Sequence, residues 1–144
     1  MINFRSDNEA PVAPEIMAAI SNVNQGAAFS YGADEVSARL SQKFSRLFEC
    51  DAVVFPVATG TAANALALGH VTPPYGAIYC GEQAHVFADE CGAAGFYAGG
   101  AMIRTLPDVE GKITPEVFAN ALSNYEAHGD HEAQPAALTV AQTT

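Results

Sequence analysis

The sequence has few basic residues and no apolar run long enough to cross a bilayer. Only six of its 144 residues are lysine or arginine, against 16 aspartates and glutamates, and the formal net charge is -10. Nucleic acids and anionic membranes attract basic surfaces, so we expect neither as a partner. A transmembrane helix needs about 20 consecutive apolar residues, and no stretch approaches that length.

We expect no secretory signal at the start of the chain, because "MINFRSDNEAP" carries charged residues early and no apolar core. The three cysteines, Cys50, Cys80 and Cys91, have the spacing of neither a disulfide scaffold nor a metal site. We therefore expect reduced thiols, no bound metal and a cytoplasmic location. The length suits one ordinary domain with its own core.

Apolar, β-branched stretches alternate with amphipathic stretches along the chain. Helical spacing predicts helices over residues 14–24, 35–49, 61–70, 85–99 and 115–125. Short apolar runs predict strands over residues 52–57, 77–80, 102–106 and 136–141. Asp34 and Thr114 are the expected N-caps of the second and last helices. This alternation favours an α/β fold, with a mainly parallel sheet flanked by helices and preceded by N-terminal helices.

The segment "ATGTAAN", residues 58–64, lies between a predicted strand and a predicted helix. Gly60 would let the backbone turn sharply and approach a ligand closely. Thr59 and Thr61 add hydroxyls beside the unpaired N–H groups of the first helical turn, a combination that suits an anion. The segment has neither the lysine of a P-loop nor the glycines of a dinucleotide fingerprint. The residues alone therefore fit either a phosphate site or a capped strand-to-helix turn.

A second segment, "CGEQAHVFADECG", places His85 just after a strand end, at the sheet edge expected for the Gly60 loop. A flat heteroaromatic cofactor could lie there, with a phosphate toward the helix and its ring against the imidazole. A single histidine is more often a structural residue, and Asp89 and Glu90 fit ordinary helix carboxylates. Two further segments are, taken alone, typical of a solvated terminus ("RSDN") and of a turn ("SYGADE").

Four segments, "RSDN", "YGADE", "TGTAANALAL" and "EQAHVFADECGA", resemble the low-specificity L-threonine aldolases in their order and spacing. These enzymes form part of the β-eliminating-lyase branch of fold-type-I pyridoxal-phosphate enzymes, and the likeness covers essentially the whole chain. The resemblance implies part of the large domain of that fold. Residues 1–50 would be an N-terminal helical segment, and residues 51–144 the start of the cofactor-binding domain.

The resemblance also implies roles for individual positions. Residues 59–61 would hold the phosphate of pyridoxal 5'-phosphate (PLP), and His85 would stack on its ring as the catalytic residue. Ser6 would contact the amino-acid part of a small-molecule substrate, and Tyr31 would line the site and reach that of a neighbouring subunit. The implied reaction cleaves L-threonine or another β-hydroxy-α-amino acid to glycine and an aldehyde, in a homodimer or homotetramer.

The implied chemistry needs a lysine that carries the cofactor. The chain has two lysines, Lys43 and Lys112, and neither resembles the expected position. We therefore expect the lysine, the aspartate for the pyridine nitrogen and the carboxylate-binding arginines beyond residue 144, and the 144-residue chain alone to be inactive. The alternatives are another fold-type-I lyase or transaminase, or a non-catalytic binding fragment.

Overall fold

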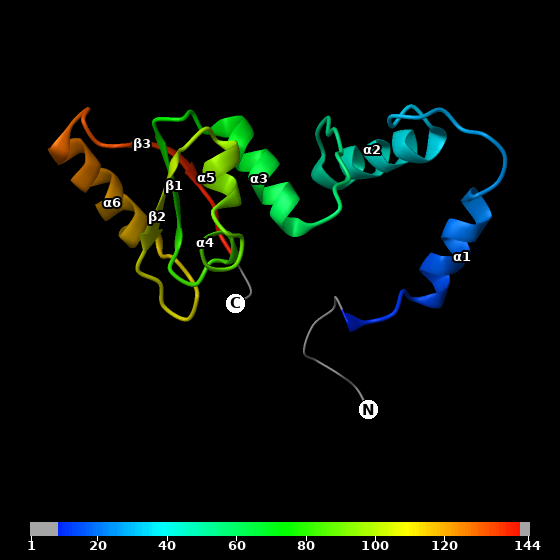
Figure 1. The fold of residues 1–144 in the computed structure, drawn as a ribbon, viewed down its shortest axis with the longest axis horizontal. Helices are drawn as coiled ribbons and strands as arrows, with labels where there is room; N and C mark the ends of the chain where they lie inside the picture. Colours follow the sequence, from blue (N-terminus) through cyan, green and yellow to red (C-terminus); the bar gives the residue numbers. More distant parts are fainter. Residues whose placement is uncertain (1–8, 142–144) are drawn as a thin grey trace. The chain divides into compact units, whose positions relative to one another are not determined.

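The computed structural model describes residues 9–141, apart from the side chains of residues 126–128. The chain divides into two compact units, Met1–Phe55 and Pro56–Thr144. Figure 1 shows the helices and strands of both. Among the described residues, no helix is both long enough and apolar enough to cross a membrane.

The first unit contains two helices, α1 (Pro14–Val23) and α2 (Glu35–Phe48), as the sequence predicts. Asp34 caps α2, because its carboxylate accepts hydrogen bonds from the N–H groups of Val36 and Ser37, both at 2.9 Å. The Ser37 hydroxyl donates a further bond of 2.7 Å to the same carboxylate. Neither helix contains a buried residue, so the apolar stripes of both helices are open to solvent within this unit.

The strand predicted over residues 52–57 is wrong, because this segment pairs with no strand in the described part of the chain. Its start is instead tied to α2 through Ser45, whose hydroxyl accepts from the N–H of Ala52 at 3.0 Å. A β-branched, apolar run forms a strand only where a neighbouring strand completes its hydrogen bonds. Composition alone therefore gave the wrong structure for this segment.

The second unit holds a three-stranded sheet with the order β2-β1-β3, and both strand pairs are parallel. Its elements follow one another as α3 (Gly60–Val71), β1 (Gly76–Gly81), α4 (His85–Ala88), α5 (Ala93–Tyr97), β2 (Met102–Leu106), α6 (Pro115–His128) and β3 (Gln134–Leu138). The central strand β1 is buried along its whole length. The predicted α/β class with a mainly parallel sheet is confirmed.

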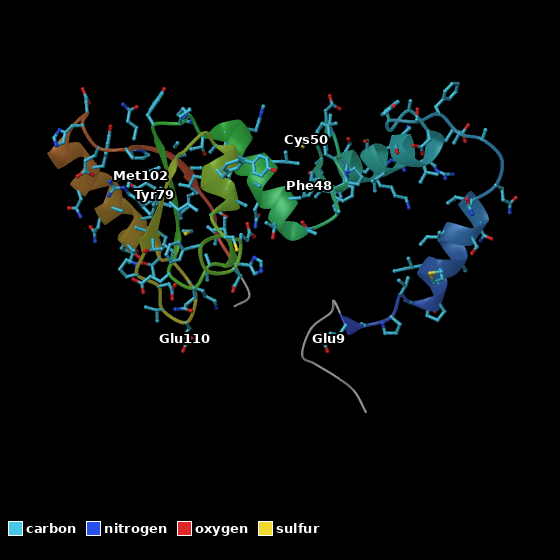
Figure 2. All side chains as sticks on the ribbon, in the orientation of Figure 1. Glu9, Phe48, Cys50, Tyr79, Met102 and Glu110 are labelled. Carbon is cyan, nitrogen blue, oxygen red and sulfur yellow. The ribbon has the colours of Figure 1, made fainter. Side chains whose placement is uncertain are left out.

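Helices cover both faces of this sheet (Figure 1). Successive side chains of a strand point to opposite faces, and β1 divides in this way between two cores. Ile78 and Cys80 pack with Leu68 of α3 and Ala94 of α5. Tyr79 lies on the face toward α6 (Figure 2), where its ring meets that of Phe118 edge-on with centroids 5.8 Å apart. This parallel arrangement puts the carboxyl ends of all three strands at one edge.

Two further sequence predictions need correction. The strand expected over 136–141 begins and ends earlier, as β3. The single helix expected over 85–99 is broken in two: α4 ends at Ala88, where the C-cap Asp89 is not helical (φ -124°, ψ 6°), and Cys91 (φ 51°) and Gly92 (φ 73°) before α5 have left-handed backbone conformations. A right-handed helix cannot continue through such residues. This break shapes the site described below.

The α2 cap gives a test of pH dependence. The hydroxyl and the backbone N–H of Ser37 lower the pKa of the Asp34 carboxyl below its usual value of 3.8. A carboxylate with a lowered folded-state pKa stabilises the fold above its unfolded pKa, and this stabilisation is lost as the pH falls through the folded pKa. We expect the amides of Val36 and Ser37 to lose protection from hydrogen exchange between about pH 5 and pH 2.5, after correction for intrinsic rates.

The variant D34N is the control, since asparagine keeps an acceptor oxygen but does not ionise. Its protection should be nearly independent of pH over the same range. Equal pH dependence in D34N and in the wild type would contradict this account of the cap.

Candidate active site

The first turn of α3 has an open N-terminal end whose groups suit an anion. Thr59 is the N-cap residue, and its Oγ1 accepts a hydrogen bond from the N–H of Ala62 at 3.1 Å. Within residues 9–141, the N–H groups of Gly60 and Thr61 donate no hydrogen bond, as expected at the start of a helix. Unpaired N–H groups, neighbouring hydroxyls and the positive end of the helix dipole together suit a phosphate.

The reason expected for Gly60 is only partly right. Its backbone lies outside the left-handed region, so the turn into α3 does not depend on the conformational freedom of glycine. A Cβ at this position would meet no atom within 4 Å, so the packing of the chain does not require glycine either. Close approach of a ligand to the backbone is the role of Gly60 that the geometry still supports.

His85 lies at the start of α4, just after the carboxyl end of β1 (Figure 1). Its Nδ1 is 2.9 Å from Oε1 of Glu90, and the side chain is 65% exposed. Glu90 follows α4, in the break before α5, and its side chain is completely buried. The imidazole is therefore held at one nitrogen while most of the ring stays accessible.

Asn64 connects this pair to α3. Its Nδ2 donates a hydrogen bond of 2.7 Å to the same Oε1 of Glu90. Asn64 lies four residues after Gly60, about 6 Å along the helix axis from it. The N-terminal half of α3 and the His85 ring are thus joined through one buried carboxylate, at the edge of the sheet where α/β proteins bind ligands.

The other predicted site residues, Ser6 and Tyr31, precede the second unit in the chain. Ser6 lies outside the described residues. Tyr31 belongs to the first unit, in the connection between α1 and α2, where it has a positive φ of 59° and a fully exposed side chain. Lys43 and Lys112 are both exposed. The roles of Ser6 and Tyr31 stay predictions.

The contributions of Glu90 and Asn64 to the site were not predicted from the sequence. On a continuous helix, residues 85 and 90 would lie about 140° apart around the axis, on different faces. Glu90 reaches His85 because α4 ends at Ala88, where the C-cap Asp89 (φ -124°, ψ 6°) leaves the helical conformation. Asn64 and Glu90 are 26 residues apart, so no local pattern connects them. The sequence predicts an ordinary carboxylate at both residue 89 and residue 90. Only the neighbouring Asp89, which is exposed, fits that prediction.

A cavity of about 520 Å³ lies on the other face of the sheet, between β2 and α6, and includes Tyr79, Arg104 and Glu132. It contains none of the predicted site residues. Its arginine is paired with Glu132 through Nη2 at 3.3 Å, and its buried Nε has no hydrogen-bond partner among the described residues. No group of three or more His, Cys, Asp or Glu in the described residues could hold a metal ion. We therefore place the candidate site at the edge formed by α3, α4 and Glu90.

Comparison with known proteins identifies the family of the chain. A family model described as β-eliminating lyase matches residues 3–144. Low-specificity L-threonine aldolases of Pseudomonas sp. (strain NCIMB 10558) and Pseudomonas aeruginosa are each 39% identical to the chain over 142 residues. Those residues are 98% of this chain and 40% of each relative. The chain thus spans about two fifths of the length of the curated relatives it matches.

A solved structure that is similar to this chain is also that of a threonine aldolase. The threonine aldolase of Leishmania major matches with a TM-score of 0.79 and 25% identity, covering 88% of this chain and 36% of that one. The predicted resemblance is confirmed by the family model, the relatives and the fold. The chain belongs to the β-eliminating lyase family.

Proposed function

We propose that the complete natural protein containing this chain cleaves L-threonine and other β-hydroxy-α-amino acids to glycine and an aldehyde. The enzymes of this family, threonine aldolases among them, depend on PLP, and we propose the same cofactor here. Residues 51–144 would then be the start of the PLP-binding domain, preceded by the helical segment of residues 1–50. The observation that carries the proposal is the anion-binding end of α3, joined through Glu90 to an exposed imidazole.

The residues at the start of α3 fit the phosphate of PLP. The chain has a net charge of -10, so a bound phosphate dianion needs strong local compensation. The N–H groups of Gly60 and Thr61 and the hydroxyls of Thr59 and Thr61 would supply it by donating hydrogen bonds at the positive end of the helix dipole. The open space beside Gly60 leaves room for close approach to the backbone.

The exposed ring of His85 would lie against the pyridine ring of the cofactor. When bound, PLP supplies an electron sink for the electron pair of the breaking Cα–Cβ bond. Glu90 would keep the imidazole in one orientation, and therefore the cofactor ring in one plane, which decides which Cα bond is broken. Ser6 would contact the amino-acid part of the substrate, and Tyr31 would line a site, reaching that of a neighbouring subunit.

We also propose a cytoplasmic location and a homo-oligomer, either a dimer or a tetramer. The three cysteines are unpaired, and burial raises the pKa of the Cys80 thiol, which supports reduced, unreactive sulfur at that position. Exposed apolar side chains on α1, among them Ile16, Met17 and Ile20, support an interface with another copy of the chain.

An activity assay tests the proposed function. We expect the complete protein, purified and loaded with PLP, to release glycine and an aldehyde in equal amounts from L-threonine and from phenylserine. It should leave tryptophan unchanged. Amino transfer to an oxo acid would instead indicate a transaminase, cleavage of tryptophan another lyase, and absence of any product a non-catalytic protein.

Substitution at the start of α3 tests the phosphate site. We expect T59A and T61A each to weaken PLP binding roughly 10- to 100-fold, because each loses a hydrogen bond to a charged group. A titration followed by cofactor fluorescence measures the dissociation constant. T59S and T61S keep the hydroxyl and should bind nearly as tightly as the wild type.

S123A is a matched control, since Ser123 is exposed on α6, on the other face of the sheet. Unchanged binding in T59A and T61A would overturn the assignment of the phosphate site. Circular dichroism of each variant shows whether T59A, which also loses the α3 cap, stays folded.

The proposed interface on α1 can be tested by introducing charge. We expect the double variant I16D/I20D to lower the molar mass of the complete protein in light scattering, because a buried charge without a partner opposes association. N22D adds charge to the opposite side of the same helix and should leave the mass unchanged. An unaltered mass in I16D/I20D would mean that α1 is not an interface.

A further inference from the structure

We propose that Glu90 is a positioning residue, which fixes both the orientation of the His85 ring and the ring nitrogen that carries its proton. Asn64 holds the Glu90 carboxylate in place. This inference rests on the proposed function, in which His85 contacts the cofactor ring. The sequence alone predicts only an ordinary helix carboxylate at Glu90, with no part in the site.

The geometry selects one nitrogen of His85. Oε1 of Glu90 lies 2.9 Å from Nδ1 and accepts a second hydrogen bond from Nδ2 of Asn64 at 2.7 Å. An ionised carboxylate only accepts hydrogen bonds, so the proton of a neutral imidazole must lie on Nδ1. Nε2 then remains an acceptor, available to the cofactor or to a substrate proton.

The Glu90 carboxylate is a poor choice for stability alone. Its side chain is fully buried, and Oε2 has no hydrogen-bond partner among the described residues. A buried oxygen without a donor destabilises a fold, and an apolar side chain of similar volume would avoid that cost. Residues that break such a rule are typical of functional sites. The carboxylate is therefore explained by what it does to His85.

Asn64 extends the same constraint to the other end of the cofactor. It belongs to α3, whose first turn would hold the phosphate, whereas His85 would contact the ring. The bonds from Asn64 and His85 meet on one oxygen, so the distance between the phosphate end and the ring end is set before any ligand binds. Such preorganisation lowers the ordering that the ligand must impose.

The experiment uses the complete protein with ¹⁵N-labelled histidine, measured by solid-state NMR with and without PLP. The His85 signals are assigned by their loss in H85N. We expect the neutral ring of the wild type to carry its proton on Nδ1. In E90M, which removes the acceptor, more than roughly half of the signal should move to the form protonated on Nε2. Cleavage of L-threonine should fall roughly tenfold or more in kcat/KM.

Two variants separate positioning from a structural effect. E90Q keeps an acceptor oxygen and should retain the Nδ1-protonated form and most of the activity. D89N removes a neighbouring exposed carboxylate and should match the wild type in both measurements. If E90M does not fold, N64A tests the same point. Without the hydrogen bond from Asn64, the Glu90 carboxylate should no longer be fixed, so that the Nδ1-protonated and Nε2-protonated forms of His85 coexist.

Two results would overturn the inference: a wild-type His85 protonated on Nε2 when neutral, or an unchanged Nδ1-protonated form in E90M or, failing that, in N64A. A failure of the proposed function looks different, because the wild type would then neither bind PLP nor cleave L-threonine. The NMR signature without PLP would in that case still report whether Glu90 positions the ring.

Discussion

A completely buried carboxylate in a protein needs hydrogen-bond donors around it, and Glu90 obtains them from two separate elements. Asn64 of α3 and His85 at the start of α4 both bond to its Oε1, at 2.7 and 2.9 Å. Without the carboxylate, nothing described in this part of the chain ties the imidazole to α3. The candidate site is therefore a consequence of one buried carboxyl group and of the backbone that brings it there.

That backbone is the broken helix after β1. The helix α4 ends at Ala88, so Glu90 leaves the helical path, and the left-handed conformations of Cys91 and Gly92 start α5 in a new direction. The parallel sheet places the carboxyl end of β1 at the edge reached by the first turns of α3. Local backbone geometry and sheet topology together bring a helix N-terminus, an imidazole and a carboxylate to one edge, where a charged cofactor can bind.

Much of the fold could be predicted from the sequence, but the contacts that join the residues of the site could not. Helical spacing located α1 and α2, and an apolar run located β2, because these patterns depend on near neighbours. The apolar run at 52–57 gave a wrong prediction of a strand, because strand formation depends on a partner strand that composition does not reveal. The segment 59–61 and His85 stood out by residue type, whereas Glu90 did not, because its significance comes from the early end of α4 and from a partner 26 residues away.

The central claim is that the start of α3 and the Glu90–His85 pair form one preorganised cofactor site. A crystal structure of the complete protein with PLP tests this most directly. The account predicts the phosphate within hydrogen-bond distance of the Gly60 and Thr61 N–H groups, and the cofactor ring against His85 with Nδ1 still bonded to Glu90. A phosphate bound elsewhere, or an imidazole released from Glu90, would contradict it.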